Sequence, residues 1–254
     1  MSTRLVLQGT GIVSRCGRGW ACQGVPDGGP VDASVPPHVY RVAPAILSDK
    51  VALKKLRRAD RFSKLAALSA WDAVLAAGFP VGMESAELGI IVTTAFGPHQ
   101  TTFGFLDEVL DFGDAGVSPT RFSHSVHNAA AAYTAMMLGS RGPTSTIADF
   151  ERPLYAGALL ASVWLREGRC GKVLVTYTEE SSVPMEYIAA NWKGTERTIF
   201  CQPLHFSEDP ASLLSEGSVS LVLAQSDCSG KVVDLEGLAE VRDSVGLRQF
   251  VGEG

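Results

Sequence analysis

Residues 117–148 read VSPTRFSHSVHNAAAAYTAMMLGSRGPTSTIA, and this stretch carries most of the information about the fold. A polar loop leads into the Ala- and Met-rich segment Asn128–Leu138, whose composition predicts a buried helix. Gly139 and the pair Gly142-Pro143 mark the end of that helix. The β-branched run Thr144–Ala148 then predicts a short strand. A buried helix that leads directly into a strand is typical of an α/β architecture.

The flanking segments continue this alternation. Apolar runs predict buried strands at Leu5–Val13, Leu88–Thr94, Lys172–Thr178 and Val219–Ala224. Helical spacing of apolar residues predicts helices at Asp60–Ala77, Phe103–Phe112 and residues 153–167. We expect Val219–Ala224 and Lys231–Val241 to pair as a hairpin, and the Gly- and Pro-rich residues 15–48 to form an irregular insertion. The order of elements predicts an α/β fold, a mostly parallel sheet layered with helices, in a single domain over residues 1–254.

Composition excludes several classes of protein. Hydrophobic residues make up 46% of the 254 residues and charged residues 19%, which suits a sizeable core. The formal net charge of −5 argues against a nucleic-acid binder. The longest apolar stretch, Tyr155–Leu165, is too short to cross a bilayer, which needs about 20 residues. The N-terminus has no basic leader before a long apolar run, so we expect a cytoplasmic protein without a membrane span.

Neither a metal site nor another cofactor is expected. The five cysteines (Cys16, Cys22, Cys170, Cys201 and Cys228) are scattered and form no CxxC pair, which favours free thiols in a reducing compartment. Arg15 and Arg18 beside Cys16 would lower the pKa of its thiol, but no His accompanies it, so an incidental loop thiol is favoured. His124 and His127 have no nearby acid or thiol to complete a metal site. The sequence Gly9-Thr10-Gly11 lacks the third glycine of a dinucleotide fingerprint.

Five segments together resemble the N-terminal half of the β-ketoacyl synthase family, within the thiolase superfamily. They are RRADRFSKLAALSAWDAVLAAG (57–78), LGIIVTTAFGP (88–98), residues 117–148, GRCGKVLVTYTEE (168–180) and EGSVSLVLA (216–224). Their order and spacing match the family over essentially the whole chain. The resemblance implies an N-terminal ketosynthase-type domain, half of a thiolase-like fold.

The position of the family's nucleophile departs from the pattern. In active members the strand after Gly-Pro runs into a nucleophile elbow with Cys at its tip. Counting from Gly142-Pro143 places Glu151 at that position. A carboxylate does not replace a thiolate here, because the thiolate must form a thioester and then leave again. Pro153 and Leu154 also stand where small residues let the chain turn closely, so we expect no catalytic residue.

A second departure is length. Active members have a C-terminal half with two catalytic histidines and a lysine, and the five histidines of this chain lie in no such motifs. The joint loss favours a non-catalytic subunit that resembles the short chain-length-factor-like proteins of aryl polyene and other type II pathways. Such a subunit pairs with an active ketosynthase as a heterodimer or heterotetramer. The alternative is an active malonyl decarboxylase that primes chains, with Glu151 in the nucleophile position.

A dense basic cluster precedes and enters the first predicted helix. It comprises Lys54, Lys55, Arg57, Arg58 and Arg61, with Lys64 one turn further on. A local basic patch on an acidic protein steers acidic partners, and acyl carrier proteins are acidic. The other interpretation is a solvated helix face.

The resemblance also implies an interface and a gate. The strand before the elbow, residues Thr144, Ser145, Thr146, Ile147 and Ala148, would pair antiparallel with a partner subunit. The loop and helix that follow VSP would close the end of the partner's acyl tunnel through Phe122, His124, Val126, His127 and Asn128. Phe122 is the preferred gate, and the alternative is that it packs in the local core.

Overall fold

The computed structural model describes residues 4–14, 17–19, 39–49, 52–81, 84–191, 214–225, 228, 230–241 and 244–252. The strands are β1 (Leu5–Ser14), β2 (Gly17–Arg18), β3 (Val39–Tyr40), β4 (Leu88–Thr94), β5 (Thr144–Ala148), β6 (Lys172–Glu179), β7 (Leu214–Ser215), β8 (Gly217–Gln225) and β9 (Lys231–Val233). The α-helices are α1 (Arg61–Ala76), α2 (His99–Phe112), α3 (Pro119–Ser125), α4 (Ala129–Leu138), α5 (Pro153–Arg166), α6 (Val183–Asn191), α7 (Leu235–Glu240) and α8 (Ser244–Val251). Short 3₁₀ helices are η1 (Ile46–Ser48), η2 (Ala52–Leu56) and η3 (Asp114–Gly116).

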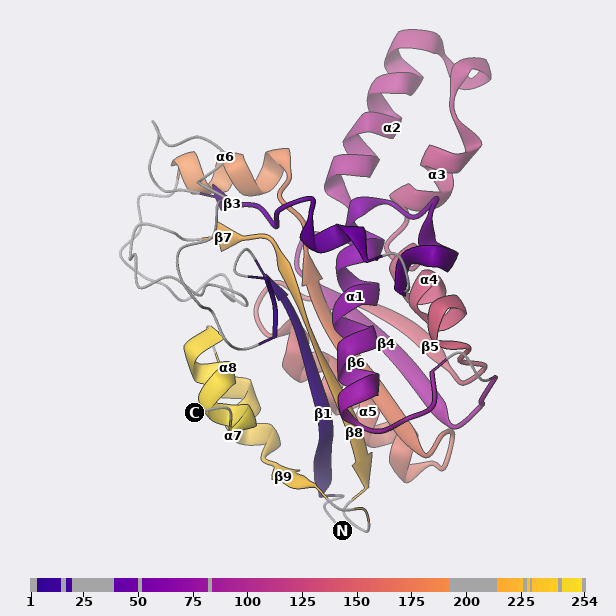
Figure 1. Ribbon diagram of the computed structural model, residues 1–254. Coiled ribbons are helices and arrows are strands. Elements are labelled where there is room, and N and C mark those ends of the chain that lie inside the picture. The colour runs from indigo at the N-terminus through magenta and orange to yellow at the C-terminus, as the bar shows by residue number, and fades with distance from the viewer. Residues whose placement is uncertain are drawn as a thin grey trace.

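One mixed sheet forms the centre of the molecule (Figure 1). Its strands lie in the order β2-β1-β8-β6-β4-β5, and β9 pairs with the outer side of β1. Strands β5, β4 and β6 are parallel, whereas β8 runs antiparallel between β6 and β1. All the central strands except β8 therefore point the same way, which confirms the predicted α/β class with a mostly parallel sheet.

Helices cover both faces of this sheet and create two apolar layers. Helices α1 and α4 pack on one face, against side chains such as Ile90, Val92 and Leu174. Helices α5, α7 and α8 pack on the other face, against Ile91, Val175 and their neighbours. Successive residues of a strand point to opposite faces, so buried strands that are apolar throughout supply both layers.

The predicted hairpin between residues 219–224 and 231–241 is wrong. β8 pairs with β6 and β1, and β9 pairs with Leu5–Leu7 of β1. The rest of the expected second strand is helix α7. Asp234 starts that helix because its side chain accepts a hydrogen bond from the backbone N–H of Glu236 at 3.1 Å. Of the expected insertion at residues 15–48, most lies outside the described residues.

Helix α1 lies unusually close to β1. A Cβ atom at Gly11 would stand 2.0 Å from the carbonyl oxygen of Ser69 and 2.5 Å from the nitrogen of Ala73, and one at Gly9 would stand 2.4 Å from the carbonyl oxygen of Ala73. At this contact the Ser69 hydroxyl meets that of Ser218 at 2.6 Å. The two glycines therefore serve helix–sheet packing.

A helical arm projects from the body of the molecule (Figure 1). We use "arm" for residues 99–125, which comprise α2, η3 and α3. Arg121 of α3 holds the arm together: its Nε lies 3.0 Å from a carboxylate oxygen of Glu108, and its Nη1 donates to the carbonyl of Gly104 at 3.1 Å. No residue of α2 is buried.

The close contact predicts that Gly11→Ala destabilises the fold by about 1–3 kcal/mol, because the new methyl group meets helix backbone that moves only as a unit. The control is Gly104→Ala on α2. A Cβ there meets only the flexible end of Arg121, and the change gains up to about 1 kcal/mol of helix propensity. Urea unfolding measures both. A Gly11→Ala protein as stable as the wild type would contradict the proposed packing role.

Candidate functional site

Three turns meet at one edge of the sheet. Thr94, Ala148 and Glu179 end the neighbouring parallel strands β4, β5 and β6. Because the carboxyl ends of parallel strands share an edge, the segments that follow them gather there. This edge holds the residue predicted to replace the nucleophile and the base of the arm.

Glu151 lies in the turn between β5 and α5. The Asp149 side chain shapes this turn, since its Oδ1 accepts hydrogen bonds from the backbone N–H groups of Glu151 at 2.8 Å and Arg152 at 3.0 Å. Helix α5 then begins at Pro153. The Glu151 side chain is exposed, and no described residue donates a hydrogen bond to its carboxylate. The turn therefore offers a solvated carboxylate and no thiol.

Glu179, at the end of β6, is buried and bound to the neighbouring turn. It accepts hydrogen bonds from the Thr94 hydroxyl at 3.0 Å, from the N–H of Ala95, and from the N–H of Phe96 at 3.2 Å. Burial raises the pKa of its carboxyl to about 7, although these donors oppose the shift. Its carboxyl group thus fills the backbone concavity after β4.

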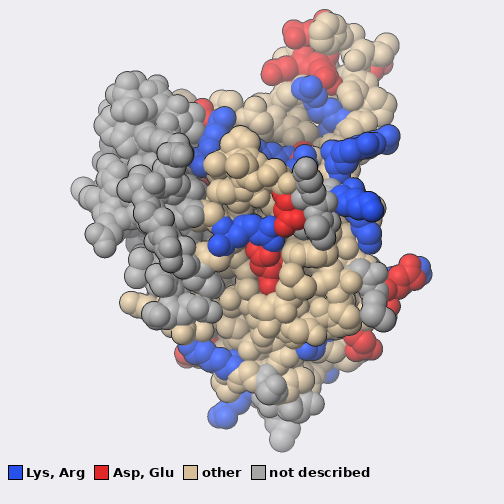
Figure 2. All heavy atoms as spheres, viewed as in Figure 1, with Lys and Arg blue, Asp and Glu red and all other residues tan. Residues whose placement is uncertain are grey.

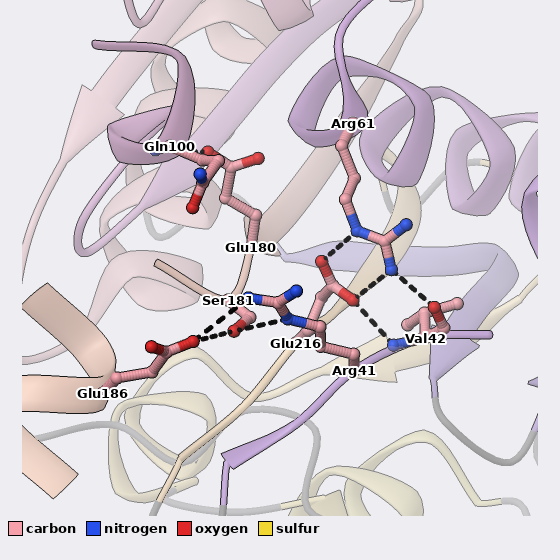
Figure 3. Close-up of polar contacts among 8 residues, drawn as sticks. All are labelled: Arg41, Val42, Arg61, Gln100, Glu180, Ser181, Glu186 and Glu216. Carbon is pink, nitrogen blue, oxygen red and sulfur yellow. Dashed lines mark hydrogen bonds and ion pairs between the residues drawn. The ribbon is translucent and has the colours of Figure 1, made fainter. Parts of the chain in front are cut away.

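Glu180 follows directly and is also buried. Its Oε1 accepts a hydrogen bond from the N–H of Gln100 at 2.9 Å, whereas its Oε2 has no partner among the described residues. Figure 3 shows it beside Gln100 and apart from the neighbouring ion pairs. Burial, and then the negative charge of Asp60, raise the pKa of this carboxyl to about 8. Sequence reasoning missed both glutamates. The available signal was two acids that directly follow a buried strand.

An ion pair between the partly buried Arg61 and the buried Glu216 lies near Glu180 (Figure 3). The guanidinium of Arg61 donates from Nε and Nη2 to the two carboxylate oxygens of Glu216, each at 2.6 Å. The N–H of Val42 donates to the same carboxylate at 2.6 Å, and Arg61 in turn donates to the Val42 carbonyl. Arg61 is therefore turned inward, and the structure separates it from the other members of the basic cluster.

The remaining basic residues line a common groove. We use "basic groove" for the cavity of about 940 Å³ that is lined by Lys54, Lys55, Arg57, Arg58 and Lys64, together with Leu56, Tyr133 and Met136. None of these five cations forms an ion pair with a described residue, and Lys55 donates only to the carbonyl of Met136 at 3.5 Å. Figure 2 shows Lys and Arg gathered below the arm and Asp and Glu at the arm's tip. The groove thus has an apolar floor and a mainly positive rim, to which Asp49, paired with Arg18, contributes the one acid among the lining residues.

The five gate candidates fall into two groups. His124 is buried, and its Nε2 lies 2.6 Å from the Tyr133 hydroxyl, so it joins α3 to α4. Val126, His127 and Asn128 are exposed in the turn between these helices. Phe122 is 56% exposed and lies against Phe105 with ring centroids 5.5 Å apart. The alternative that Phe122 packs in the local core is therefore wrong.

Sequence reasoning also missed a row of rings that leads from the β5–α5 turn onto the arm. Phe150 meets Phe96 edge-on at 5.6 Å, Phe96 lies 6.3 Å from His99, and His99 lies 5.8 Å from Phe103. Burial, and then the nearby His127, lower the pKa of His99. Residues 99 and 103 lie four apart on α2 and so share one helical face, which was the signal for the part of this row on the arm.

Strand β5 is the outermost strand of the sheet. On one side it pairs with β4: the N–H of Asp149 donates to Thr94 at 2.9 Å, and the carbonyl of Pro143 accepts from Ile90 at 2.9 Å. Alternate residues of a strand direct both backbone groups to the same side, so those of Thr144, Thr146 and Ala148 point away from β4. The Ile147 side chain packs against the core.

Neither of the two described cysteines adds a reactive group to this edge. Cys170 is buried, and burial raises the pKa of its thiol, while Cys228 is exposed. Cys16, Cys22 and Cys201 lie outside the described residues. Across the described part of the chain, no group of three or more His, Cys, Asp or Glu residues is placed to hold a metal ion. No described helix is both long enough and apolar enough to cross a membrane.

The family model for the N-terminal domain of β-ketoacyl synthases matches residues 42–199. Those residues include the basic groove, the arm, β5 and the Glu179–Glu180 pair. Because the match covers more than half of the sequence, the chain belongs to the β-ketoacyl synthase family. A search of curated proteins finds no significant match.

Solved structures share the fold. The ishigamide ketosynthase/chain length factor superposes with a TM-score of 0.70 and 22% identity, over 91% of this chain and 65% of that chain. A β-ketoacyl synthase from Burkholderia phymatum STM815 gives a TM-score of 0.62 and 18% identity, over 89% of this chain and 60% of that one. A type II polyketide ketosynthase in complex with its acyl-carrier protein superposes with a TM-score of 0.65 and 16% identity. The match covers 89% of this chain and 64% of that chain. The chain thus spans less than two thirds of the length of these relatives.

The ion-paired Arg61 and the cations of the basic groove should differ in how much they contribute to folding stability. Arg61→Ala leaves the buried Glu216 carboxylate without its cation, and we expect a loss of about 2–3 kcal/mol, somewhat below that of a fully buried pair because Arg61 is partly exposed. Arg58→Ala in the groove should change stability by less than about 0.5 kcal/mol. Urea unfolding at pH 7 compares the two variants. Equal stabilities would show that the ion pair is not structural.

Proposed function

We propose that this chain is a non-catalytic, chain-length-factor-type subunit that pairs with an active β-ketoacyl-ACP synthase. The observation that carries the proposal is the turn after β5, where a ketosynthase needs its thiolate and this chain has the exposed Glu151. Type II polyketide or fatty acid biosynthesis, in particular an aryl polyene-like pathway, is the proposed setting. The similarity to a ketosynthase/chain length factor supports this class of partner.

The alternative, a malonyl decarboxylase that primes chains through Glu151, has weaker support. A carboxyl group that acts as an acid or a nucleophile works best in a shielded site that tunes its pKa. Glu151 is exposed and receives no side-chain partner from the described residues. The buried carboxyls of this edge, Glu179 and Glu180, are instead bound to backbone N–H groups.

The open edge of β5 is the proposed contact with the ketosynthase. The outward backbone groups of Thr144, Thr146 and Ala148 pair with no strand in the described part of the chain, and such an edge pairs readily with a strand of another chain. Residues Thr144, Ser145, Thr146, Ile147 and Ala148 would then form an antiparallel pair across the interface.

Thr146→Pro tests this assembly. Proline removes the outward N–H at the centre of the edge while the bonds from β5 to β4, made by the alternate residues, stay in place. We expect the complex with a co-expressed ketosynthase to be lost in size-exclusion chromatography, with the variant still folded by circular dichroism. Thr146→Val, which keeps the N–H and the branched shape, should still assemble. Assembly of the proline variant would refute the placement of the interface.

The basic groove is the proposed docking site for the acyl carrier protein. Lys54, Lys55, Arg57, Arg58 and Lys64 present positive charge around an apolar floor. Charge of one sign in a concave site raises the association rate of an oppositely charged partner. Arg61 takes no part, because Glu216 neutralises it.

The arm and the turn that follows it at residues 126–128 are the proposed gate of the partner's acyl tunnel. Phe122, Val126, His127 and Asn128 present their side chains to solvent, while His124 fixes α3 in place through Tyr133. Phe122 is the preferred gate because a rigid exposed aromatic ring blocks an apolar tunnel at little cost in conformational entropy.

Phe122→Ala in the reconstituted complex should give longer products with assembly unchanged. Because the ring is 56% exposed, we expect truncation to cost less than about 1 kcal/mol of folding stability, well below the loss for a buried Phe. Mass spectrometry of the released chains measures product length. The control is Phe112→Ala. The Phe112 ring is also exposed, at the far end of α2, and its removal should leave product length unchanged. Unaltered products from Phe122→Ala would remove it as the gate.

A further inference from the structure

Helix α2 begins without a cap of its own. Its N-cap residue is Pro98, which has no side-chain acceptor, and no local side chain caps the helix. The first N–H groups of any helix lack partners within it, and the positive end of the helix dipole lies there. The base of the arm therefore depends on acceptors from elsewhere in the fold.

Two consecutive residues at the end of β6 supply these acceptors. Glu180 accepts a hydrogen bond from the N–H of Gln100 in the first turn of α2, at 2.9 Å. Glu179 accepts hydrogen bonds from the N–H groups of Ala95 and Phe96 in the preceding turn, the latter at 3.2 Å. Two buried carboxyl groups thus bind the backbone on which the arm is mounted.

Among the described residues, α2 has few other contacts with the body apart from its packing beside α6. No residue of the helix is buried, and the ion pair of Glu108 with Arg121 lies within the arm. A hydrogen bond of 3.4 Å from the Thr101 hydroxyl to Asp60 is long. The row of rings through Phe96 and His99 adds an apolar contact.

We propose that Glu179 and Glu180 form a pH-sensitive latch that holds the base of the arm and loosens as the pH rises through the neutral range. The latch is a property of the fold, and the inference does not depend on the proposed function. It stands on the missing cap of α2, the exposed surface of that helix and the three N–H groups that the two carboxyls bind.

The direction of the effect follows from proton linkage. With the arm closed, burial raises the pKa of Glu179 to about 7 and that of Glu180 to about 8, from an ordinary 4.5. When the arm opens, water reaches both groups and their pKa values fall towards that ordinary value. The closed state therefore binds more protons between pH 4.5 and these values, so rising pH favours opening.

The charges that face the latch act in the same sense. Asp60 at the start of α1 and Glu216 at the start of β8 repel the ionised form of Glu180, and only Arg61 attracts it. Arg61 is already bound to Glu216. His99 of α2 has a lowered pKa and is neutral in this range, so it supplies no compensating charge. The donors around Glu179, including the Thr94 hydroxyl, are neutral.

Hydrogen exchange measured by mass spectrometry between pH 6 and 8.5 tests the latch on the intact chain. After correction for intrinsic exchange rates, the opening constant of peptides over residues 95–112 should rise by up to tenfold per pH unit for each carboxyl that the closed state still holds protonated. This applies to Glu179 up to about pH 7 and to Glu180 up to about pH 8, above which the constant should level off. Peptides from α5, which the latch does not touch, should show no such rise. An opening constant in residues 95–112 that does not change with pH would overturn the proposal.

Variants separate the charge from the hydrogen bond. Glu180→Gln keeps an acceptor for Gln100 without a charge, so residues 95–112 should open at least tenfold less than wild type at pH 8, with a shallower pH dependence. Glu180→Ala removes the acceptor and should leave these residues open at every pH. Glu186→Gln is the matched control, because the Glu186 carboxylate contacts Arg41 and Ser181 and makes no hydrogen bond to α2. An undiminished pH slope in Glu180→Gln would exclude Glu180 from the latch.

Discussion

The carboxylate of Glu216 is the constraint on which the upper edge of the molecule depends. It is wholly buried, and a buried carboxylate is stable only if charge and hydrogen bonds replace the water it has lost. Arg61 and the N–H of Val42 provide them. A hydrogen bond from Arg61 to the Val42 carbonyl completes this network around the carboxylate. The segment before η1, the first turn of α1 and the start of β8 therefore have one mutual arrangement, which places Asp60 and Arg61 above the end of the sheet.

This arrangement determines how the neighbouring acids behave. Arg61 is occupied by Glu216, so little positive charge remains for Glu180. Asp60, held at the start of α1 by its bond to the N–H of Ser63, adds a second negative charge. The close packing of α1 on Gly9 and Gly11 fixes the position of the helix on the sheet. Glu180 is thus held in an electrostatic environment that favours its neutral form, and the raised pKa is a consequence of the fold rather than of one contact.

Sequence predicts the parts of this protein that depend on local pattern. Strands β4 and β6 and helices α1 and α5 were predictable because continuous apolar runs and helical spacing are local signals. Lys231–Val241 misled because two β-branched residues, Val232 and Val233, precede the capping residue Asp234, and strand pairing is not encoded locally. Likewise, a run of cations does not reveal that Arg61 turns inward, since Glu216 is 155 residues away in the sequence. Spacing alone also could not tell buried His124 from exposed Phe122, because tertiary contacts decide which face of α3 meets α4.

The two edges of the sheet differ in a way that limits how a partner could approach. On one edge β1 is already paired, with β9 along Leu5–Leu7 and with β2 at Val13–Ser14. On the other edge β5 pairs with β4 alone among the described strands, and the arm and α4 lie on this same side in Figure 1. A strand that added to β5 would therefore approach the molecule from the side on which the arm stands, so the position of the arm would affect that approach.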